Sequence, residues 1–311
     1  MNASSKTAVL FLLYFVSSSS LLVLNKVAIT AIPNASLLLF VQLSSTVVLM
    51  LASSLLGKSQ IKYKQSMTYM WAYSTVATVF LATIYSNFRV IHSIGVNPFI
   101  VLKCSTPLLV SVLDWTFMGR TLPDWKSTLA LFGILCSSSI YARLKITDPS
   151  FSVSTDVDTD TAVGLFWSMT WLISFCLDMV YVKYVVEKYP CSSSERTLYQ
   201  NFLALPFLAV LLIGGIEEHN VGEASQASQS AHIAVLLTCF AGAALSFSGM
   251  ALRTELSATM FTILGIVSKM ASTLLNEIFV EPERDLSRLF CIAGVIFSSS
   301  FYGQAPLKNV S

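Results

Sequence analysis

The chain has 311 residues, of which 54% are hydrophobic and 12% are charged, and its formal net charge is +2. Soluble globular domains carry roughly 25% charged residues, so this composition excludes an ordinary soluble domain. The small net charge gives no indication of a nucleic-acid partner. We therefore predict an all-α membrane protein with several membrane-spanning helices.

Ten apolar segments follow one another along the chain, and most are long enough to cross about 30 Å of hydrocarbon as a helix. We expect helices at 7–30, 36–57, 67–91, 95–118, 125–143, 162–188, 196–216, 231–252, 255–279 and 287–304. The connections are short and leave no room for a soluble catalytic domain; the two longest are 145–160 and 217–231. We interpret the first segment as a retained helix, because no small-residue cleavage site follows a short apolar core.

Lysine and arginine residues are distributed unequally between the two sets of loops. Ten flank the helices on the side that would hold both termini, and four lie on the other side. Cytoplasmic loops carry the excess of basic residues in membrane proteins. We therefore expect both termini in the cytosol.

A short motif in the fifth segment recurs in the tenth. Residues 133–141 read Gly-Ile-Leu-Cys-Ser-Ser-Ser-Ile-Tyr, and residues 294–302 read Gly-Val-Ile-Phe-Ser-Ser-Ser-Phe-Tyr. The offset is half of the chain, which predicts two five-helix repeats, 1–150 and 151–311, within one membrane domain. An odd number of helices per repeat gives the repeats opposite orientations, and in such folds a substrate site lies near the midplane between the repeats. Chance similarity of two Ser-rich helices is the alternative.

Lys103 and Lys269 each lie well inside an apolar segment. Lys103 lies within the stretch 97–113, and Lys269 lies in the middle of the stretch 261–279. An ionised side chain at the centre of a bilayer costs roughly 2.5–3.5 kcal/mol on insertion scales. A chain carries such a residue where it faces a water-filled cavity or an anion. The two lysines therefore predict a binding site for a negatively charged ligand.

The sequence around the second lysine resembles a known signature. It reads Gly265-Ile-Val-Ser268-Lys269, which is similar to the Gly-x-x-Asn-Lys motif of Golgi GDP-sugar transporters in the drug/metabolite transporter superfamily. Ser268 replaces the usual Asn, so a hydroxyl stands where the family has an amide. Glycine permits a close approach of a ligand or a helix, and lysine supplies a point charge for phosphate.

The seventh segment partly matches the second signature of this family, Phe-Tyr-Asn-Asn, which is associated with nucleobase recognition. The chain reads Leu198-Tyr199-Gln200-Asn201 at this place. An amide side chain both donates and accepts hydrogen bonds, as recognition of a guanine edge requires. The alternative for Asn201 is a hydrogen bond that joins two helices in the membrane.

Three further places resemble the family pattern: the first helix, an eighth-helix serine segment, and a position four residues before the first lysine where some relatives have Tyr and this chain has Phe. The segments 178–186 and 262–269 look closest to the plant-type branch. The residues that the resemblance implies for substrate binding are Tyr14, Asn25, Phe99, Lys103, Tyr199, Gln200, Asn201, Ser246, Ser248, Phe261, Gly265, Ser268 and Lys269.

The resemblance implies an antiporter that moves a GDP-sugar of the GDP-mannose class into the Golgi lumen in exchange for GMP, by alternating access and without a cofactor or a metal. A homodimer in the lipid membrane is left open. The alternatives are a UDP-sugar or a sugar- or triose-phosphate as cargo, the endoplasmic reticulum as the location, and a membrane-embedded transferase. Against an enzyme, the sequence shows no clustered carboxylate pair, no metal-spaced His or Cys and no nucleophile motif.

Other polar residues have ordinary explanations. Arg89 lies near a helix end, where its side chain can reach the lipid headgroups. Asp114 is expected to neutralise a nearby Lys or Arg, although a role in proton coupling is left open. Asn34 belongs to a glycosylation sequon that lies close to the membrane.

Overall fold

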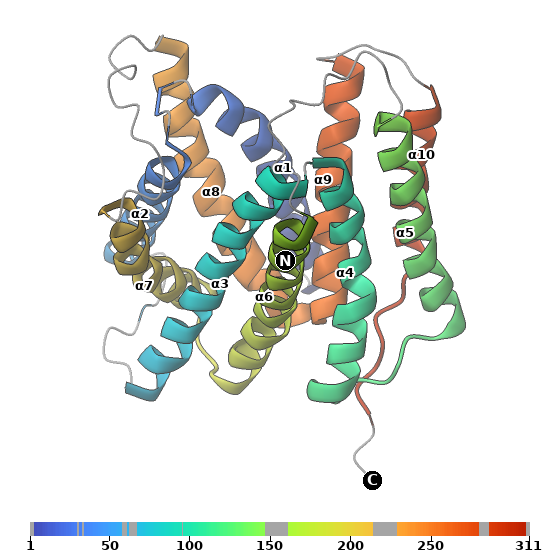
Figure 1. The fold of residues 1–311 in the computed structure, drawn as a ribbon. Coiled ribbons are helices and arrows are strands. Elements are labelled where there is room, and N and C mark those ends of the chain that lie inside the picture. The colour runs from blue at the N-terminus through green and yellow to red at the C-terminus, as the bar shows by residue number, and fades with distance from the viewer. Residues whose placement is uncertain are drawn as a thin grey trace. The chain divides into compact units, whose positions relative to one another are not determined.

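A computed structural model shows an all-helical arrangement (Figure 1). It describes residues 3–29, 31–32, 34–57, 61, 67–94, 96–146, 161–213, 229–279 and 286–308. Each predicted apolar segment forms a helix with boundaries within a few residues of those expected: α1 Ala3–Ala28, α2 Ala35–Leu55, α3 Met67–Ile94, α4 Val96–Phe117, α5 Trp125–Ile146, α6 Thr161–Lys188, α7 Ser193–Ile213, α8 Gln229–Glu255, α9 Ala258–Phe279 and α10 Leu286–Ser300. The two longest predicted loops lie almost entirely outside the described residues.

Seven of these helices, α1 to α6 and α8, are long and apolar enough to cross a membrane. The chain is therefore consistent with a multi-pass membrane protein. Helices α9 and α10 are apolar but shorter over the residues that the structure describes. Helix α7 begins with the polar run Ser-Ser-Glu-Arg-Thr, which weakens its apolar character.

The chain forms two compact units. Unit 1 comprises Met1–Leu81 and Val185–Glu255, and unit 2 comprises Ala82–Tyr184 and Leu256–Ser311. Unit 1 thus holds α1, α2, α7 and α8, and unit 2 holds α4, α5, α9 and α10. Each unit draws helices from both of the predicted repeats.

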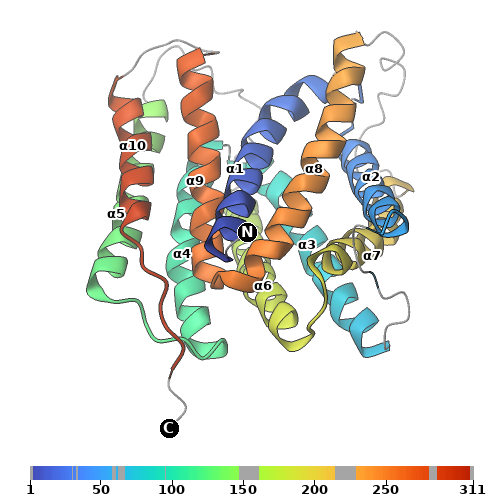
Figure 2. The same cartoon turned by 180° about the vertical axis from the view of Figure 1, so that it is seen from behind.

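In unit 1, α1 packs along α8, and α2 packs against both α7 and α8 (Figure 2). Small residues allow the close approach of α1 and α8, because Ala28 and Ala234 lie together in a buried cluster with Leu38 of α2. A second buried cluster joins α2, α3 and α7 through Leu43, Leu81 and other apolar side chains. Helix packing in this unit therefore rests on van der Waals contacts between apolar faces.

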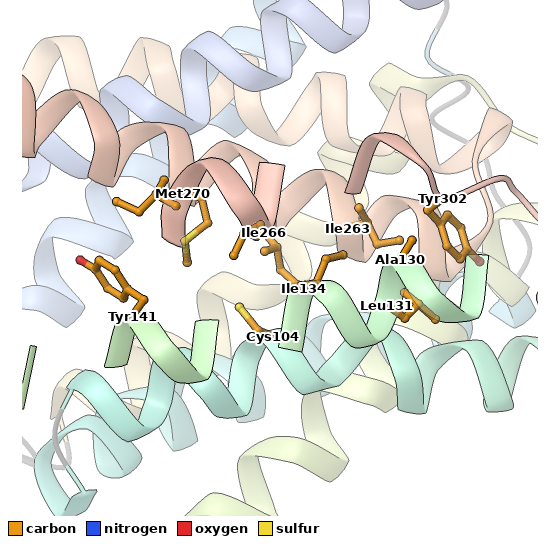
Figure 3. Close-up of a cluster of buried hydrophobic side chains, with 11 residues drawn as sticks. Cys104, Ala130, Leu131, Ile134, Tyr141, Ile263, Ile266, Met270 and Tyr302 are labelled. Carbon is orange, nitrogen blue, oxygen red and sulfur yellow. The ribbon is translucent and has the colours of Figure 1, made fainter. Parts of the chain in front are cut away.

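In unit 2, the core lies where α4, α5, α9 and α10 meet (Figure 3). Cys104 of α4 contributes a small side chain to this core, and Ile134, Ile266 and Ile292 contribute branched side chains from the three other helices. This core holds α4 and α9, the helices that carry the two lysines.

Helices α5 and α10 cross through a reciprocal pair of glycine–serine contacts. A Cβ atom at Gly133 would lie 2.6 Å from Ser298 Oγ, and a Cβ atom at Gly294 would lie 2.8 Å from Ser137 Oγ. Only glycine allows the backbones to come this close. Because Gly133 and Gly294 are equivalent positions of the recurring motif, as are Ser137 and Ser298, the contact is symmetric under exchange of the two helices.

The same symmetry extends along both helices. Residues 131–138 and 292–299 show the same succession of buried, half-buried and exposed side chains. Ser138 and Ser299, which are equivalent in the motif, each donate a hydrogen bond to the carbonyl three residues earlier, at 2.9 and 2.6 Å. The similarity of the two segments is therefore structural as well as sequential.

The chain after α10 forms a strap, residues 303–308, that lies along the turn between α4 and α5. The amide of Thr121 donates to the Pro306 carbonyl at 2.9 Å, and the amide of Lys308 donates to the Gly119 carbonyl at 2.7 Å. Gly119 has a φ of 63°, a conformation that favours glycine. Helix α10 ends before the expected boundary because the chain leaves it to form these bonds.

Two arginines near helix ends are buried, Arg196 in α7 and Arg288 in α10. The guanidinium of Arg196 donates to the carbonyl of Val186 at 3.3 Å, in the last turn of α6. A cation at this place is favoured by the unsatisfied carbonyls of a helix C-terminus. Arg196 is thus a structural residue and gives little information about membrane orientation.

Asn34 and Asp124 cap the N-termini of α2 and α5 by accepting a hydrogen bond from a backbone amide of the first turn. Asn34 accepts from the Leu37 amide at 2.7 Å and is only 9% exposed. Asp124 accepts from the Ser127 amide at 2.9 Å, and the hydrogen bonds from Ser127 lower the pKa of this carboxyl group. These are ordinary N-caps, and the cap explains the presence of Asn34 without glycosylation.

Candidate functional site

Lys103 lies at a break in the hydrogen bonding of α4. Pro107, four residues later, has no amide hydrogen to donate to the carbonyl of Lys103. The hydroxyl of Thr106 donates to this carbonyl instead, at 2.6 Å. The proline therefore loosens the helix at the lysine without leaving its backbone oxygen unsatisfied.

The amino group of Lys103 lies over two aromatic rings. Its Nζ is 4.2 Å from the centroid of Phe99, one turn earlier on α4, and 5.9 Å from the centroid of Trp171 on α6. The two rings meet edge to face with centroids 4.8 Å apart. Such contacts stabilise a cation by roughly 0.5–2 kcal/mol, depending on its exposure to water. The two rings therefore offset part of the free-energy cost of placing the charge of Lys103 in a membrane helix.

Lys269 lies on α9, which packs against α4 in unit 2. Its amino group and that of Lys103 are close enough to influence each other electrostatically. Lys269 is exposed and Lys103 is half-buried. The structure thus brings the two predicted lysines near each other, and we call them the lysine pair.

The other predicted residues of α9 are buried or half-buried. Phe261 and Ser268 are buried, and Ser268 has no exposed surface. Gly265 is half-buried, one turn before Lys269. Ser268 is therefore on the packed face of α9 in this structure, whereas Lys269 is on its open face.

Unit 1 contains the remaining predicted residues, and its best-defined group joins α7 to α8. The amide nitrogen of Asn201 donates to the Thr197 carbonyl at 2.7 Å and to Ser246 Oγ at 2.9 Å. Asn201 is 2% exposed. In this conformation Asn201 and Ser246 form the interhelical hydrogen bond that was the structural alternative for this motif. Gln200, by contrast, is half-buried.

Two further contacts of unit 1 involve predicted residues. Gln42 of α2 donates to Asn25 of α1 through their side-chain amides, at 2.9 Å. The ring of Tyr199 lies 5.8 Å from that of Tyr73, whose hydroxyl is 3.4 Å from Cys191 Sγ. These contacts fix the predicted residues on neighbouring helices.

Tyr14, half-buried on α1, lies within electrostatic range of Arg253 near the end of α8. Ser248, on α8, is fully buried and donates to the Ala244 carbonyl at 2.6 Å, within its own helix. Tyr14 is therefore within electrostatic range of a cation, whereas Ser248 bonds to its own helix in this conformation.

Several contacting residues were missed by the sequence analysis, namely Gln42, Tyr73, Trp171 and Arg253. Trp171 could have been suspected, because an aromatic residue in a membrane helix with a lysine elsewhere in the chain is a candidate cation–π partner. Gln42 also carries a signal, since it is a polar amide in the middle of an apolar helix. Neither signal identifies the partner.

The chain is similar to three proteins of Arabidopsis thaliana. It is 29% identical to GDP-fucose transporter 1, over 100% of this chain and 90% of the relative. It is 27% identical to the GDP-mannose transporter GONST3, over 95% of this chain and 77% of the relative. It is 23% identical to the GDP-mannose transporter GONST2, over 95% of this chain and 78% of the relative. No family model matches the chain.

These similarities confirm the predicted resemblance to plant GDP-sugar transporters. All three relatives are named as transporters, which agrees with the expectation that the chain is not an enzyme. A solved crystal structure shares the fold, with a TM-score of 0.68 over 96% of both chains at 10% identity. At that identity the match concerns the fold alone.

Proposed function

We propose that this protein is an antiporter that exchanges a GDP-linked sugar, of the GDP-mannose class, for GMP across the Golgi membrane. The observation that carries the proposal is the lysine pair, two basic side chains that lie near each other on the neighbouring helices α4 and α9. The names of the three relatives support a nucleotide sugar as the cargo. Because both GDP-fucose and GDP-mannose occur among these names, the sugar itself is the finer part of the proposal.

The electrostatics of the lysine pair favour a phosphate ligand. Two like charges on neighbouring helices repel each other, by an energy that falls as their separation and the effective dielectric constant increase. A ligand phosphate placed against Lys103 and Lys269 replaces this repulsion by attraction and by charge-assisted hydrogen bonds. The sugar nucleotide and GMP each carry about two negative charges at neutral pH, so the same pair neutralises either ligand.

This arrangement also accounts for exchange in preference to leak. A carrier that returns empty must reorient while Lys103 and Lys269 still repel each other. A carrier that returns with GMP reorients with the charges neutralised. Alternating access is then faster in the loaded state, which couples entry of one nucleotide to exit of the other.

The inverted-repeat architecture is part of this proposal. The reciprocal contacts of Gly133 with Ser298 and of Gly294 with Ser137 support a twofold relation between α5 and α10. Ten membrane helices as two such repeats would place both termini on the same side of the membrane, which the distribution of basic residues assigns to the cytosol.

The experiment that tests the proposal is nucleotide exchange by the purified full-length protein in proteoliposomes. Vesicles loaded with GMP are expected to accumulate radiolabelled GDP-mannose or GDP-fucose, and empty vesicles are expected to accumulate much less. UDP-sugars and triose phosphates serve as competing cargoes. Uptake that is equal with and without internal GMP would contradict antiport. Preference for a UDP-sugar or a triose phosphate would contradict a GDP-sugar as the cargo.

Gln200 provides a prediction about the base. Replacing Gln200 with alanine is expected to lower the preference for guanine over uracil nucleotides by about tenfold, because one or two hydrogen bonds to the base edge would be lost. The measurement is the ratio of inhibition constants for GMP and UMP. The matched control is Gln229→Ala, which removes an exposed amide of the same size at the start of α8. An unchanged ratio in Gln200→Ala would exclude base recognition by this residue.

A further inference from the structure

Asp114 connects the two helices that carry the lysine pair. It lies near the end of α4 and is 3% exposed. Its Oδ2 atom accepts a hydrogen bond from the backbone amide of Thr259 at 2.9 Å and another from the Thr259 hydroxyl at 2.7 Å. Thr259 lies in the first turn of α9. These two bonds show that Asp114 holds a helix terminus.

The first turn of α9 is held by side chains from outside the helix as well as by its own cap. Ser257 is the N-cap, and its hydroxyl accepts from the Met260 amide at 3.1 Å. The amide of Ser257 donates to Gln304 of the strap at 3.1 Å. Because a carboxylate also complements the positive end of the helix dipole, this terminus is fixed both by geometry and by charge.

The spacing along the two helices relates this anchor to the lysine pair. Asp114 comes 11 residues after Lys103 on α4, and Lys269 comes 10 residues after Thr259 on α9. At 1.5 Å per residue these intervals are about 16 and 15 Å. The antiparallel helices α4 and α9 thus meet at the Asp114–Thr259 contact and again, about three turns away, at the lysine pair. A slip of α9 by one turn, about 5.4 Å, would take Lys269 away from Lys103.

We propose that Asp114 is a positioning residue for the lysine pair: by anchoring the start of α9 on α4, it fixes the register in which Lys269 meets Lys103. The ligand would then meet two cations at a set separation. Asp114 itself contacts no ligand in this account. The expected effect on KM rests on the proposed transport function, whereas the anchoring of α9 can be measured without any ligand.

The test compares Asp114→Ala, Asp114→Asn and Thr259→Val in the full-length protein. Asp114→Ala is expected to raise the KM for GDP-mannose by about tenfold or more, with a smaller change in kcat, because the displaced lysines bind phosphate less well. Asn retains an acceptor for the Thr259 amide, so Asp114→Asn should stay within about threefold of the unmodified protein. Thr259→Val should lie between them. The matched control is Thr262→Val, which removes a hydroxyl that donates to the Ala258 carbonyl within α9.

Amide hydrogen exchange of the ligand-free protein provides the second readout. Exchange at residues 259–261 is expected to accelerate about tenfold or more in Asp114→Ala and to stay slow in Thr262→Val. Unchanged exchange would overturn the anchoring. Faster exchange with an unchanged KM would overturn the link to the lysine pair. If the unmodified protein takes up no nucleotide sugar, the proposed function fails, and the exchange measurement still decides whether Asp114 anchors α9.

Discussion

Replacing Lys269 with alanine is expected to lower the GMP-driven uptake of GDP-mannose by roughly 100-fold at limiting substrate. A charge-assisted hydrogen bond contributes about 1.5–3 kcal/mol, and loss of one cation leaves the other to bind the ligand phosphate alone. Lys103→Ala is expected to have an effect of similar size, and it also leaves the rings of Phe99 and Trp171 without their cation. The measurement is the initial rate of uptake into proteoliposomes at matched protein density.

The control for these variants is Lys126→Ala. Lys126 is exposed at the start of α5, where its ammonium lies 5.8 Å from the ring centroid of the adjacent Trp125. Its removal is expected to leave uptake unchanged. If Lys103→Ala and Lys269→Ala both transport at the rate of Lys126→Ala, phosphate recognition by the pair is excluded.

Replacing Gly133 with alanine is expected to destabilise the protein by about 1–3 kcal/mol, measured as a lower Tm in detergent. The new Cβ would lie 3.1 Å from the Cβ of Ser298 as well as close to its hydroxyl, so rotation of that hydroxyl does not relieve the overlap. Gly294→Ala should have a smaller effect, because the corresponding distance to the Cβ of Ser137 is 3.4 Å.

Compensating substitutions make this prediction specific. Ser298→Gly should restore the Tm of Gly133→Ala, and Ser137→Gly should restore that of Gly294→Ala, since each removes the atoms that clash. The crossed combinations should restore nothing. Gly242→Ala in α8 is the control, because its Cβ would lie at an ordinary 3.9 Å from Gln42. Equal rescue by matched and crossed partners would contradict the reciprocal crossing of α5 and α10.

The helices could be predicted from the sequence because apolar runs of about 20 residues have few alternatives in a membrane. The end of α10 was placed too late, because its apolar composition continues to Tyr302 while the hydrogen bonds of the chain beyond it go to the turn around Gly119. The burial of Arg196 and Arg288 was not predicted either, because it depends on contacts with residues that are distant in the sequence. Hydropathy reports composition, and it does not report which distant carbonyl or carboxylate satisfies a polar group.

The lysine pair could be predicted only in part. An isolated charge in an apolar segment identifies Lys103 and Lys269 separately, but their meeting depends on the packing of α4 against α9. The roles of Trp171 and Asp114 depend on that packing as well, since each acts on a residue that is distant in the sequence. For Asn201 the amide itself was recognised, whereas its bond to Ser246 depends on how α7 meets α8.

Titration calorimetry with the purified protein tests the central claim most directly. GMP and guanosine differ only by the phosphate, so the difference between their binding free energies isolates the contribution of the phosphate. We expect GMP to bind at least about 100-fold more tightly than guanosine to the unmodified protein, and we expect this ratio to fall to within about tenfold in Lys269→Ala. Equal affinity for GMP and guanosine in the unmodified protein, or a ratio that Lys269→Ala leaves unchanged, would contradict phosphate binding by the lysine pair.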